Sequence, residues 1–393
     1  MMERIVLAYS GGFDTSVAIP WLAGKYGAEI VAVTMDLGQG PELEAVRDRA
    51  LAAGAVRAHV LDVREEFARD HVLRALTAGA IADDGDPIGT ALALPLIARK
   101  LVEIAAIEQA SVIAHGGTGN SRGRTRLNVR GRLEVHERLD LMARALNPAI
   151  TVLAPVREWD MTRPEEVEYA KTRGIPVTAA DTSFSVEANL WGRSIEPPVA
   201  DGRWPDPPAA IYTMTRPPEE CPAETALVEI AFERGVPTAI NGVGMPLLEL
   251  IASLGTIAGA HGVGRGVSYE APAAVVLHTA HRELQRVVST PDAEGFSRLV
   301  SLQYTDIVYN GQWFTPLREA LDAYVDKIQE RVSGLVRLEL SKGDCRIASC
   351  TSPFAVADLA QATSDAGDAF KQRATSGLLE IVGLPSKTAA RKA

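Results

Sequence analysis

Residues 4–22 read RIVLAYSGGFDTSVAIPWL, an apolar run followed by a short loop with two glycines and then by a second apolar stretch. The run at 5–8 has the length and β-branched content of a buried strand, and residues 16–23 have the pattern of a helix. The loop therefore joins the carboxyl end of a strand to the amino end of a helix. Backbone N–H groups there lack partners and the helix dipole is positive, so the loop is suited to binding an anion.

The side chains of this loop favour phosphate as the anion. Gly11 and Gly12 allow a close approach and positive φ angles. Phosphate oxygens can also accept hydrogen bonds from three hydroxyl groups of the loop, those of Ser10, Thr15 and Ser16. The alternative is an ordinary strand-to-helix turn in which Asp14 or Thr15 is the N-cap.

The first 170 residues alternate between expected strands and helices. Strands are predicted near 4–9, 29–35, 57–61 and 111–117, and helices near 15–26, 42–54, 65–78 and 90–109. This alternation predicts an α/β fold with a doubly wound parallel sheet that binds ligands at the carboxyl ends of its strands. The second Gly-rich loop, HGGTGNS at 115–121, would open on the same edge as the first, and two such loops suit one extended ligand.

The sequence pattern of the chain changes beyond about Pro155. Residues 196–224 are dense in proline and predict a loop, whereas 226–242 predict a hairpin and 245–262 and 272–288 predict helices. We expect three regions: a nucleotide-binding domain over 1–170, a second α+β domain over 171–360 and a C-terminal helical tail over 361–393.

The amino-acid composition argues against several classes of protein function. Hydrophobic residues make up 47 % and charged residues 23 %, as in ordinary soluble globular proteins, and the net charge of −10 argues against a general nucleic-acid or membrane-surface binder. The three cysteines, Cys221, Cys345 and Cys350, form no C-x-x-C pair, so we expect no disulfide framework or zinc site and a reducing, cytoplasmic location. The amino end leads directly into a strand, which predicts no signal peptide, and no run has transmembrane length.

Several segments together resemble the argininosuccinate synthase family. The resemblance begins with AYSGGFDTS at 8–16, VAVTMDLGQG at 31–40 and AHGGTG at 114–119. It continues in order over nearly the full chain through IPVTAADTSFSVEANLWGRSIE at 175–196, FERGVP at 232–237, HGVGR at 261–265, YEAP at 269–272 and GLPSKTAAR at 383–391. The first motif alone is less specific, because tRNA thiolases and NAD or GMP synthetases carry close relatives of it.

The resemblance implies an N-type ATP pyrophosphatase that joins L-citrulline to L-aspartate. ATP activates the ureido oxygen as a citrullyl-AMP with loss of pyrophosphate, and the aspartate amine then displaces AMP. Such an enzyme must hold the growing charge of the leaving pyrophosphate with fixed donors, which fits the first loop. The resemblance also implies ATP and Mg²⁺, small-molecule substrates and a homotetramer formed through the second domain and the tail.

The resemblance also assigns an ATP site. Its expected residues are Ala8, Tyr9, Ser10, Gly11, Gly12, Asp14, Thr15, Ser16, Met35, His115 and Gly116. Met35 would lie against the adenine through its backbone, and His115 either touches phosphate or is structural. The expected catalytic residues are Ser10, Asp14 and Arg126. Asp14 either contributes to Mg²⁺ binding or caps the helix.

The amino-acid contacts match the family only in part. Thr118 matches the threonine of the aspartate loop, and the matching citrulline contacts are Arg126, Ser185, Ser194 and Tyr269. The family's tyrosine, serine and asparagine positions instead hold Asp86, Ala91 and Arg122, and its aspartate position holds Gly123. The segment that carries a citrulline-binding glutamate in the family is missing between Arg265 and Tyr269.

These departures change the charge of the expected pocket. Charge-assisted contacts contribute roughly 1.5 to 3 kcal/mol each, so losing several would remove most of the affinity for citrulline. New charges are Asp86 and the arginines of 122–132, among which Arg122 and Arg124 would attract a carboxylate or phosphate unless this stretch is only a solvated basic face.

We therefore expect a carbon–nitrogen ligase of the same type whose acceptor is not citrulline and whose amine is aspartate or a similar compound. Three alternatives remain open. The first is an ordinary argininosuccinate synthase with a rearranged pocket. The second is a tRNA-modifying pyrophosphatase, which would need a cysteine near the ATP loop, where this chain has none. The third is a nonenzymatic nucleotide-binding regulator, against which the intact hydroxyl cluster argues.

Overall fold

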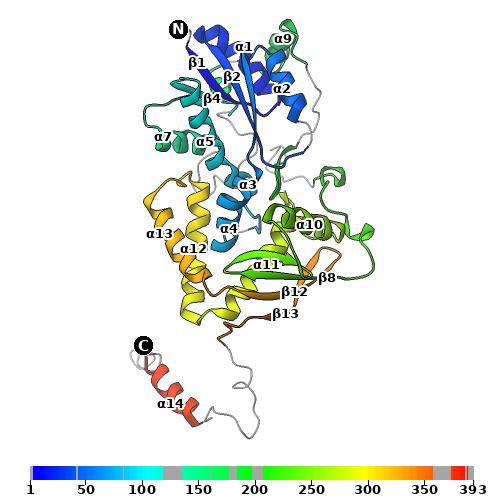
Figure 1. Cartoon of the computed structure of the whole chain (residues 1–393), viewed down its shortest axis with the longest axis vertical. Helices are drawn as coiled ribbons and strands as arrows, with labels where there is room; N and C mark the ends of the chain where they lie inside the picture. Colours follow the sequence, from blue (N-terminus) through cyan, green and yellow to red (C-terminus); the bar gives the residue numbers. More distant parts are fainter. Residues whose placement is uncertain are drawn as a thin grey trace.

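The computed structural model describes residues 3–40, 43–82, 84–117, 135–159, 161–176, 184–196, 207–356, 373–385 and 387. A parallel sheet with its helices lies at one end of an elongated body, and an antiparallel sheet with its helices lies at the other (Figure 1). None of the helices within these ranges is long and apolar enough to cross a membrane.

The first sheet contains five strands in the order β3-β2-β1-β4-β5, all parallel. They are β1 (Arg4–Ala8), β2 (Glu29–Asp36), β3 (Arg57–Asp62), β4 (Val112–His115) and β5 (Thr151–Leu153). Helices follow the strands, so the predicted α/β fold with a parallel sheet is confirmed. The predicted strands lie within one or two residues of their observed ends.

The helices of this part cover both faces of the sheet. They are α1 (Phe13–Tyr26), α2 (Leu43–Ala52), α3 (Arg64–Phe67), α4 (Leu73–Ala78), α5 (Gly89–Ile107), α7 (Val135–Leu146), α8 (Pro155–Glu158) and α9 (Arg163–Thr172). Alternate residues of β1 point to opposite faces: Ile5 and Leu7 pack in the cluster that contains α1, α2 and α9, whereas Val6 packs in the one that contains α5. Both faces are therefore buried, as in doubly wound sheets.

The helix predicted over 65–78 is continuous but not uniform. Between α3 and α4 lies a π-helical turn, η1 (Ala68–Val72), where the N–H of Leu73 donates to the carbonyl of Ala68. Its buried His71 stacks on Trp313 with 4.8 Å between ring centroids. Burial lowers the pKa of His71 to about 3, so the ring is neutral and packs as a core side chain.

The second sheet is antiparallel, in the order β10-β9-β8-β12-β13. Its strands are β8 (Ala226–Glu233), β9 (Val236–Ile240), β10 (Val243–Gly244), β12 (Gly334–Ser341) and β13 (Asp344–Thr351). The accompanying helices are α10 (Leu247–Ala260), α11 (Pro272–Val288), α12 (Pro291–Tyr309) and α13 (Pro316–Gln329). The predicted hairpin and both predicted helices are confirmed.

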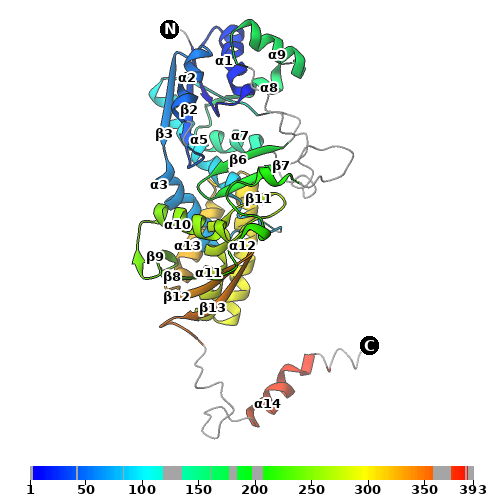
Figure 2. The same ribbon diagram turned by 90° about the vertical axis from the view of Figure 1, so that its right-hand side faces the viewer.

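A third, small sheet lies between the two ends of the body (Figure 2). Its strands, in the order β11-β7-β6, are β6 (Ser185–Asn189), β7 (Gly192–Glu196) and β11 (Tyr269–Glu270). The turn of the β6–β7 hairpin packs on the end of β2, where Leu190 N–H donates to the Leu37 carbonyl at 2.7 Å. This hairpin therefore links residues of the second half of the chain to the edge of the first sheet.

The described part of the proline-rich segment is irregular, as predicted. Over 207–224 it contains only two short 3₁₀ turns, η2 (Ala209–Ile211) and η3 (Pro218–Glu220). The fully buried Glu270 holds it to β11 by accepting hydrogen bonds of 2.7–3.0 Å from Thr213 N, Met214 N, Thr215 N, Thr215 Oγ1 and Arg193 Nη1. Both carboxylate oxygens are thus satisfied, which makes this burial of charge tolerable.

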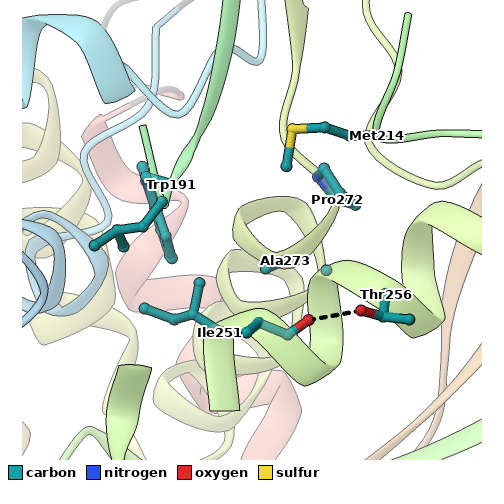
Figure 3. A pocket seen from close by; sticks show the side chains of 9 residues that line it. Trp191, Met214, Ile251, Thr256, Pro272 and Ala273 are labelled. Atoms are coloured by element: carbon teal, nitrogen blue, oxygen red, sulfur yellow. Dashed lines mark hydrogen bonds between the residues drawn. The ribbon is translucent and has the colours of Figure 1, made fainter. Parts of the chain in front are cut away.

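A cavity of about 240 Å³ lies between the β6–β7 turn, which contributes Leu190 and Trp191, and helix α10. Figure 3 shows Trp191 and Met214 on its walls and Ile251 and Thr256 of α10 along its floor. The Thr256 hydroxyl already donates to the Ala252 carbonyl at 3.0 Å. No charged side chain lines this cavity, so it offers little to a nucleotide or an amino acid.

We predict that Glu270→Gln lowers the free energy of unfolding by about 3 kcal/mol, because the amide would face donors and leave Arg193 without its charge partner. Urea unfolding measures this loss. The matched control is Glu330→Gln, which removes an exposed pair with Lys327 (2.8 Å) and should leave the free energy of unfolding nearly unchanged. Equal effects of the two substitutions would contradict the structural role of Glu270.

Candidate active site

The order of strands in the parallel sheet locates a crevice. The chain passes from β1 to β2 to β3 on one side and then returns to β4 on the other side of β1. Two neighbouring strands whose connections leave in opposite directions open a crevice at their carboxyl ends, and ligands of such sheets bind there. The loops that follow β1 and β4 are the two Gly-rich loops, and they lie on the same edge, as predicted.

The two loops are in direct contact. A Cβ atom on Gly116 would lie 2.6 Å from the methyl group of Thr15, so only glycine allows this approach. The first loop also needs glycine, since Gly11 has a φ of +79° and a Cβ there would lie 2.9 Å from both Val46 and the Arg49 guanidinium. The loops therefore pack against each other and against α2 through glycines.

Gly12 is the N-cap residue of α1, with extended backbone and no side-chain cap. The alternative in which Asp14 or Thr15 is the N-cap is therefore wrong, because both lie inside the first turn. The Gly12 carbonyl instead accepts from the hydroxyls of Thr15 (3.1 Å) and Ser16 (2.8 Å). The first N–H groups of α1 lack a side-chain acceptor and point to the crevice edge, where an anion can bind them.

The hydroxyls of the loop are not equally accessible. Ser10 is exposed, whereas Thr15 and Ser16 are 7 % and 6 % exposed. Tyr9 is buried, and its hydroxyl lies 2.8 Å from that of Ser16. The side chains of Tyr9 and Ser16 thus support the loop from the core, and among the hydroxyl side chains Ser10 is the one that faces solvent.

Asp14 is paired with a residue of α9. Arg163 Nη1 donates to Asp14 Oδ1 at 2.6 Å and to Glu166 Oε2 at 2.9 Å, and its guanidinium lies over the Phe13 ring. Burial and the neighbouring charge of Asp14 raise the pKa of Glu166, although Arg163 opposes this. These contacts tie α1 to α9 beside the loop.

Arg49 of α2 was missed by sequence reasoning. Its guanidinium contacts the position where Gly11 would carry a side chain, and its buried Nε has no hydrogen-bond partner among the described residues. A single arginine in an exposed-looking helix carries no sequence signal for this role, because only the packing of α2 on the loop brings its charge to the crevice.

Met35 and His115, two further residues of the predicted ATP site, form hydrogen bonds within the protein. Met35 is buried near the end of β2, and its carbonyl accepts from Gln39 Nε2 at 2.7 Å. His115 is 2 % exposed, and its Nδ1 accepts from Gly117 N–H at 3.0 Å, so its Nε2 donates to Asp140 at 2.6 Å. The His115 ring therefore shapes the second loop.

Asp140, which holds the His115 ring, also accepts from Arg157 at 3.0 Å. Burial alone would raise the pKa of Asp140, but the hydrogen bonds and charges of His115 and Arg157 outweigh it and hold that pKa below its usual range. The carboxylate is therefore ionised at neutral pH and fixes the orientation of His115.

Three of the residues predicted for the acceptor come together on the small sheet. Ser194 and Tyr269 are direct partners across β7 and β11, and the Thr90 hydroxyl donates to that of Ser194 at 2.8 Å. A Cβ on Gly85 would lie 3.2 Å from the Tyr269 hydroxyl, which places the loop of Asp86 against it. Asp86 is more than 100 positions away from both Ser194 and Tyr269 in the sequence.

Asp86 itself is partly buried, and its Oδ1 accepts from Ile88 N–H at 2.8 Å. Burial raises the pKa of Asp86 to about 7, with a further contribution from the charge of Asp84 and an opposing one from the Ile88 N–H. Burial, followed by the charges of these two carboxylates, also raises the pKa of Tyr269. Asp84, Asp86 and Tyr269 thus bring two carboxyl groups and a hydroxyl group together at this loop.

The remaining predicted positions are less informative. Ala91 lies in the first turn of α5 and is 4 % exposed, so it presents little surface to a ligand. Ser185 begins β6. Thr118, Arg122 and Arg126 lie outside the described residues.

The sequence also matches known families. Residues 4–176 match the arginosuccinate synthase N-terminal HUP domain, and residues 184–389 match the arginosuccinate synthase C-terminal domain. The chain belongs to the argininosuccinate synthase family. Like its homologues, it is an ATP-dependent ligase that forms carbon–nitrogen bonds.

Proteins named argininosuccinate synthase are similar along their whole length. The one from Dehalococcoides mccartyi is 42 % identical over 100 % of this chain and 97 % of its own. That from Rubrobacter xylanophilus is 44 % identical over 98 % and 94 %, and that from Geobacillus thermodenitrificans is 41 % identical over 98 % and 95 %. A solved structure, a predicted subunit of a tRNA methyltransferase from Methanocaldococcus jannaschii, is 18 % identical over 43 % of this chain and 75 % of its own, with a TM-score of 0.28, too low to inform the comparison.

We predict that Gly116→Ala weakens ATP binding roughly tenfold, because the new methyl overlaps that of Thr15 and pushes the two loops apart. Calorimetric titration with MgATP measures the change. Thr15→Ser in the same chain removes the opposing methyl, keeps the hydroxyl and should restore binding. Gly24→Ala is the control, since a Cβ on Gly24 meets nothing within 4 Å. Unaltered ATP affinity in Gly116→Ala would refute the contact's importance.

Proposed function

We propose that this member of the family activates an acceptor other than L-citrulline with ATP and joins it to an amine, with L-aspartate as the expected amine. The observation that carries the proposal is Asp86. It stands where the resemblance places a citrulline-binding tyrosine, and its loop packs against Tyr269, which pairs with Ser194; both of these positions keep the family's residues.

The ATP half of the reaction rests on the crevice between β1 and β4. The N–H groups at the start of α1 and the exposed Ser10 hydroxyl bind the leaving pyrophosphate, and Arg49 adds positive charge beside Gly11. Met35 and Gly116 contribute backbone contacts to the nucleotide. Mg²⁺ accompanies ATP as part of the substrate, and Asp14 either moves from Arg163 to contact it or keeps α1 on α9.

The chemical steps follow from the AMP-forming class. An oxygen of the acceptor attacks the α-phosphorus, the bond from this phosphorus to the bridging oxygen breaks, and pyrophosphate leaves. The amine nitrogen then attacks the activated carbon, loses a proton, and AMP leaves with the oxygen. Fixed hydrogen-bond donors that contact the pyrophosphate lower the barrier of the first step, the attack on the α-phosphorus. Arg126 is the expected catalytic residue on the acceptor side.

An ordinary argininosuccinate synthase is the second candidate, favoured by the names of the relatives at 41–44 % identity. A tRNA-modifying enzyme has less support. All three cysteines lie in the second half of the chain, and burial raises the pKa of both Cys345 and Cys350 to about 11, which disfavours a reactive thiolate.

We predict that the enzyme releases AMP and pyrophosphate in the presence of a suitable acceptor and L-aspartate, and that L-citrulline is a poor acceptor. The loss of several charged contacts corresponds to at least a hundredfold lower kcat/KM for citrulline than for the preferred acceptor. Pyrophosphate release across ureido, carbonyl and carboxylate acceptors, each with and without aspartate, measures this, and mass spectrometry identifies the product.

Two results would refute different parts of the proposal. Release of ADP and phosphate in place of AMP and pyrophosphate would exclude the AMP-forming reaction. Efficient formation of argininosuccinate from citrulline, with no better acceptor in the panel, would make the chain an ordinary argininosuccinate synthase.

We also propose a cytoplasmic homotetramer assembled through the second domain and the tail. Helix α14 (Arg373–Val382) lies apart from the body (Figure 2), and Leu379, Ile381 and Val382 are each about two-thirds exposed. Such an apolar surface is unusual on a monomer and suits contact with another copy.

Removal of the residues after Gly367 should therefore yield a smaller species, because the apolar residues of α14 are lost. Light scattering measures the mass. As a control, Ile107→Ser changes an exposed isoleucine at the end of α5, in the first domain, and should leave the mass unaltered. A truncated protein with the same number of subunits as the full chain would contradict the role of the tail.

A further inference from the structure

We propose that the side chain of Gln39 and the adenine base of ATP compete for the same backbone groups at the end of β2, so that ATP binds only when Gln39 moves away. This inference rests on the ATP half of the proposed function, in which the backbone of Met35 contacts the nucleotide. It adds a residue that lowers the affinity for ATP.

The carboxamide of Gln39 forms two hydrogen bonds with the backbone of its own segment. Its Nε2 donates to the Met35 carbonyl at 2.7 Å, and its Oε1 accepts from the Leu37 N–H at 2.6 Å. An adenine edge likewise presents a donor beside an acceptor, through its amino group and the neighbouring ring nitrogen. The same two backbone groups can therefore bind either the carboxamide or the base.

These backbone groups face the side of β2 on which β1 ends. The Val33 carbonyl accepts from the Tyr9 N–H at 2.9 Å, on the β1 side. Peptide groups alternate in direction along a strand, so those of Met35 and Leu37, two and four residues further on, face the same side. The pairing of β1 with β2 stops at Val33. The two groups therefore face the space beyond the carboxyl end of β1, where ligands of parallel sheets bind.

The Gln39 side chain can leave while its turn stays in place. Asp36 Oδ1 accepts from the Gly38 N–H at 2.9 Å, and the Leu37 carbonyl accepts from the Leu190 N–H at 2.7 Å, so other contacts hold this segment. Gln39 is exposed, so water solvates its amide after it moves and the side chain regains rotamer freedom. Adenine replaces the two hydrogen bonds that are lost.

Competition of this kind affects the base but not the phosphates. The apparent Kd of ATP equals the intrinsic Kd divided by the fraction of molecules in which the competing side chain has moved away. The two hydrogen bonds of Gln39 go to Met35 and Leu37 and not to the first Gly-rich loop. Binding of free pyrophosphate to that loop should therefore not depend on Gln39.

The test compares the native enzyme with Gln39→Ala by calorimetric titration in the presence of Mg²⁺. The probes are an ATP analogue that cannot be cleaved between the α- and β-phosphates and, separately, pyrophosphate. We expect Gln39→Ala to bind the ATP analogue roughly three- to tenfold more tightly, because the competing hydrogen bonds are gone. The affinity for pyrophosphate should be unchanged.

Two further variants separate the hydrogen bonds from other effects. Gln39→Met keeps the length of the side chain and removes both amide groups, so it should also bind the ATP analogue more tightly than the native enzyme does. Gln303→Ala removes an exposed carboxamide of α12 and is the matched control, which should leave both affinities unchanged.

Weaker or unaltered binding of the ATP analogue in Gln39→Ala would overturn the inference, because Gln39 would then contact the nucleotide or lie away from it. An equal gain in affinity for pyrophosphate would also overturn it, since the substitution would then act on the whole site. The proposed function fails independently, if Gln39→Ala binds the ATP analogue more tightly as expected and the native enzyme releases no pyrophosphate with any acceptor.

Discussion

The parallel pairing of β1 between β2 and β4 is the constraint on which the active site depends. It places the ends of two strands that are more than 100 residues apart in the sequence next to each other, Ala8 beside His115. Gly116, which follows β4, then packs against Thr15 in the first turn of α1, and the amino end of α1 opens toward the crevice between the two loops. Without this pairing, neither loop would form more than an isolated turn.

The acceptor side depends on a second long-range arrangement. The β6–β7 hairpin packs its turn on the end of β2 and pairs with the two-residue strand β11. Asn189 of this hairpin also donates to the carbonyl of Gly89, the first residue of α5, and Trp191 donates to that of Pro87, just before this helix. Residues from three regions of the chain thus surround one loop.

Two carboxylates of this region differ in the number of hydrogen bonds that they accept. Glu270 is fully buried and accepts five hydrogen bonds from Arg193 and the 213–215 segment, so its charge is used to hold the structure. Asp86 accepts one, and its pKa is raised to about 7 by burial. A satisfied buried carboxylate is a structural group, whereas a partly satisfied one is a candidate for ligand binding.

The sequence alone determined the α/β class, most helix and strand positions and the two Gly-rich loops, because periodicity and glycine placement are local signals. It did not predict the strands β6, β7 and β11, which are short and obtain their hydrogen bonds from distant partners. Nor did it indicate that Gly12 caps α1, that Asp14 pairs with Arg163 or that Arg49 lies beside Gly11. These features depend on which elements pack together, and packing is decided by the tertiary structure, since a side chain's partners need not be near it in the chain.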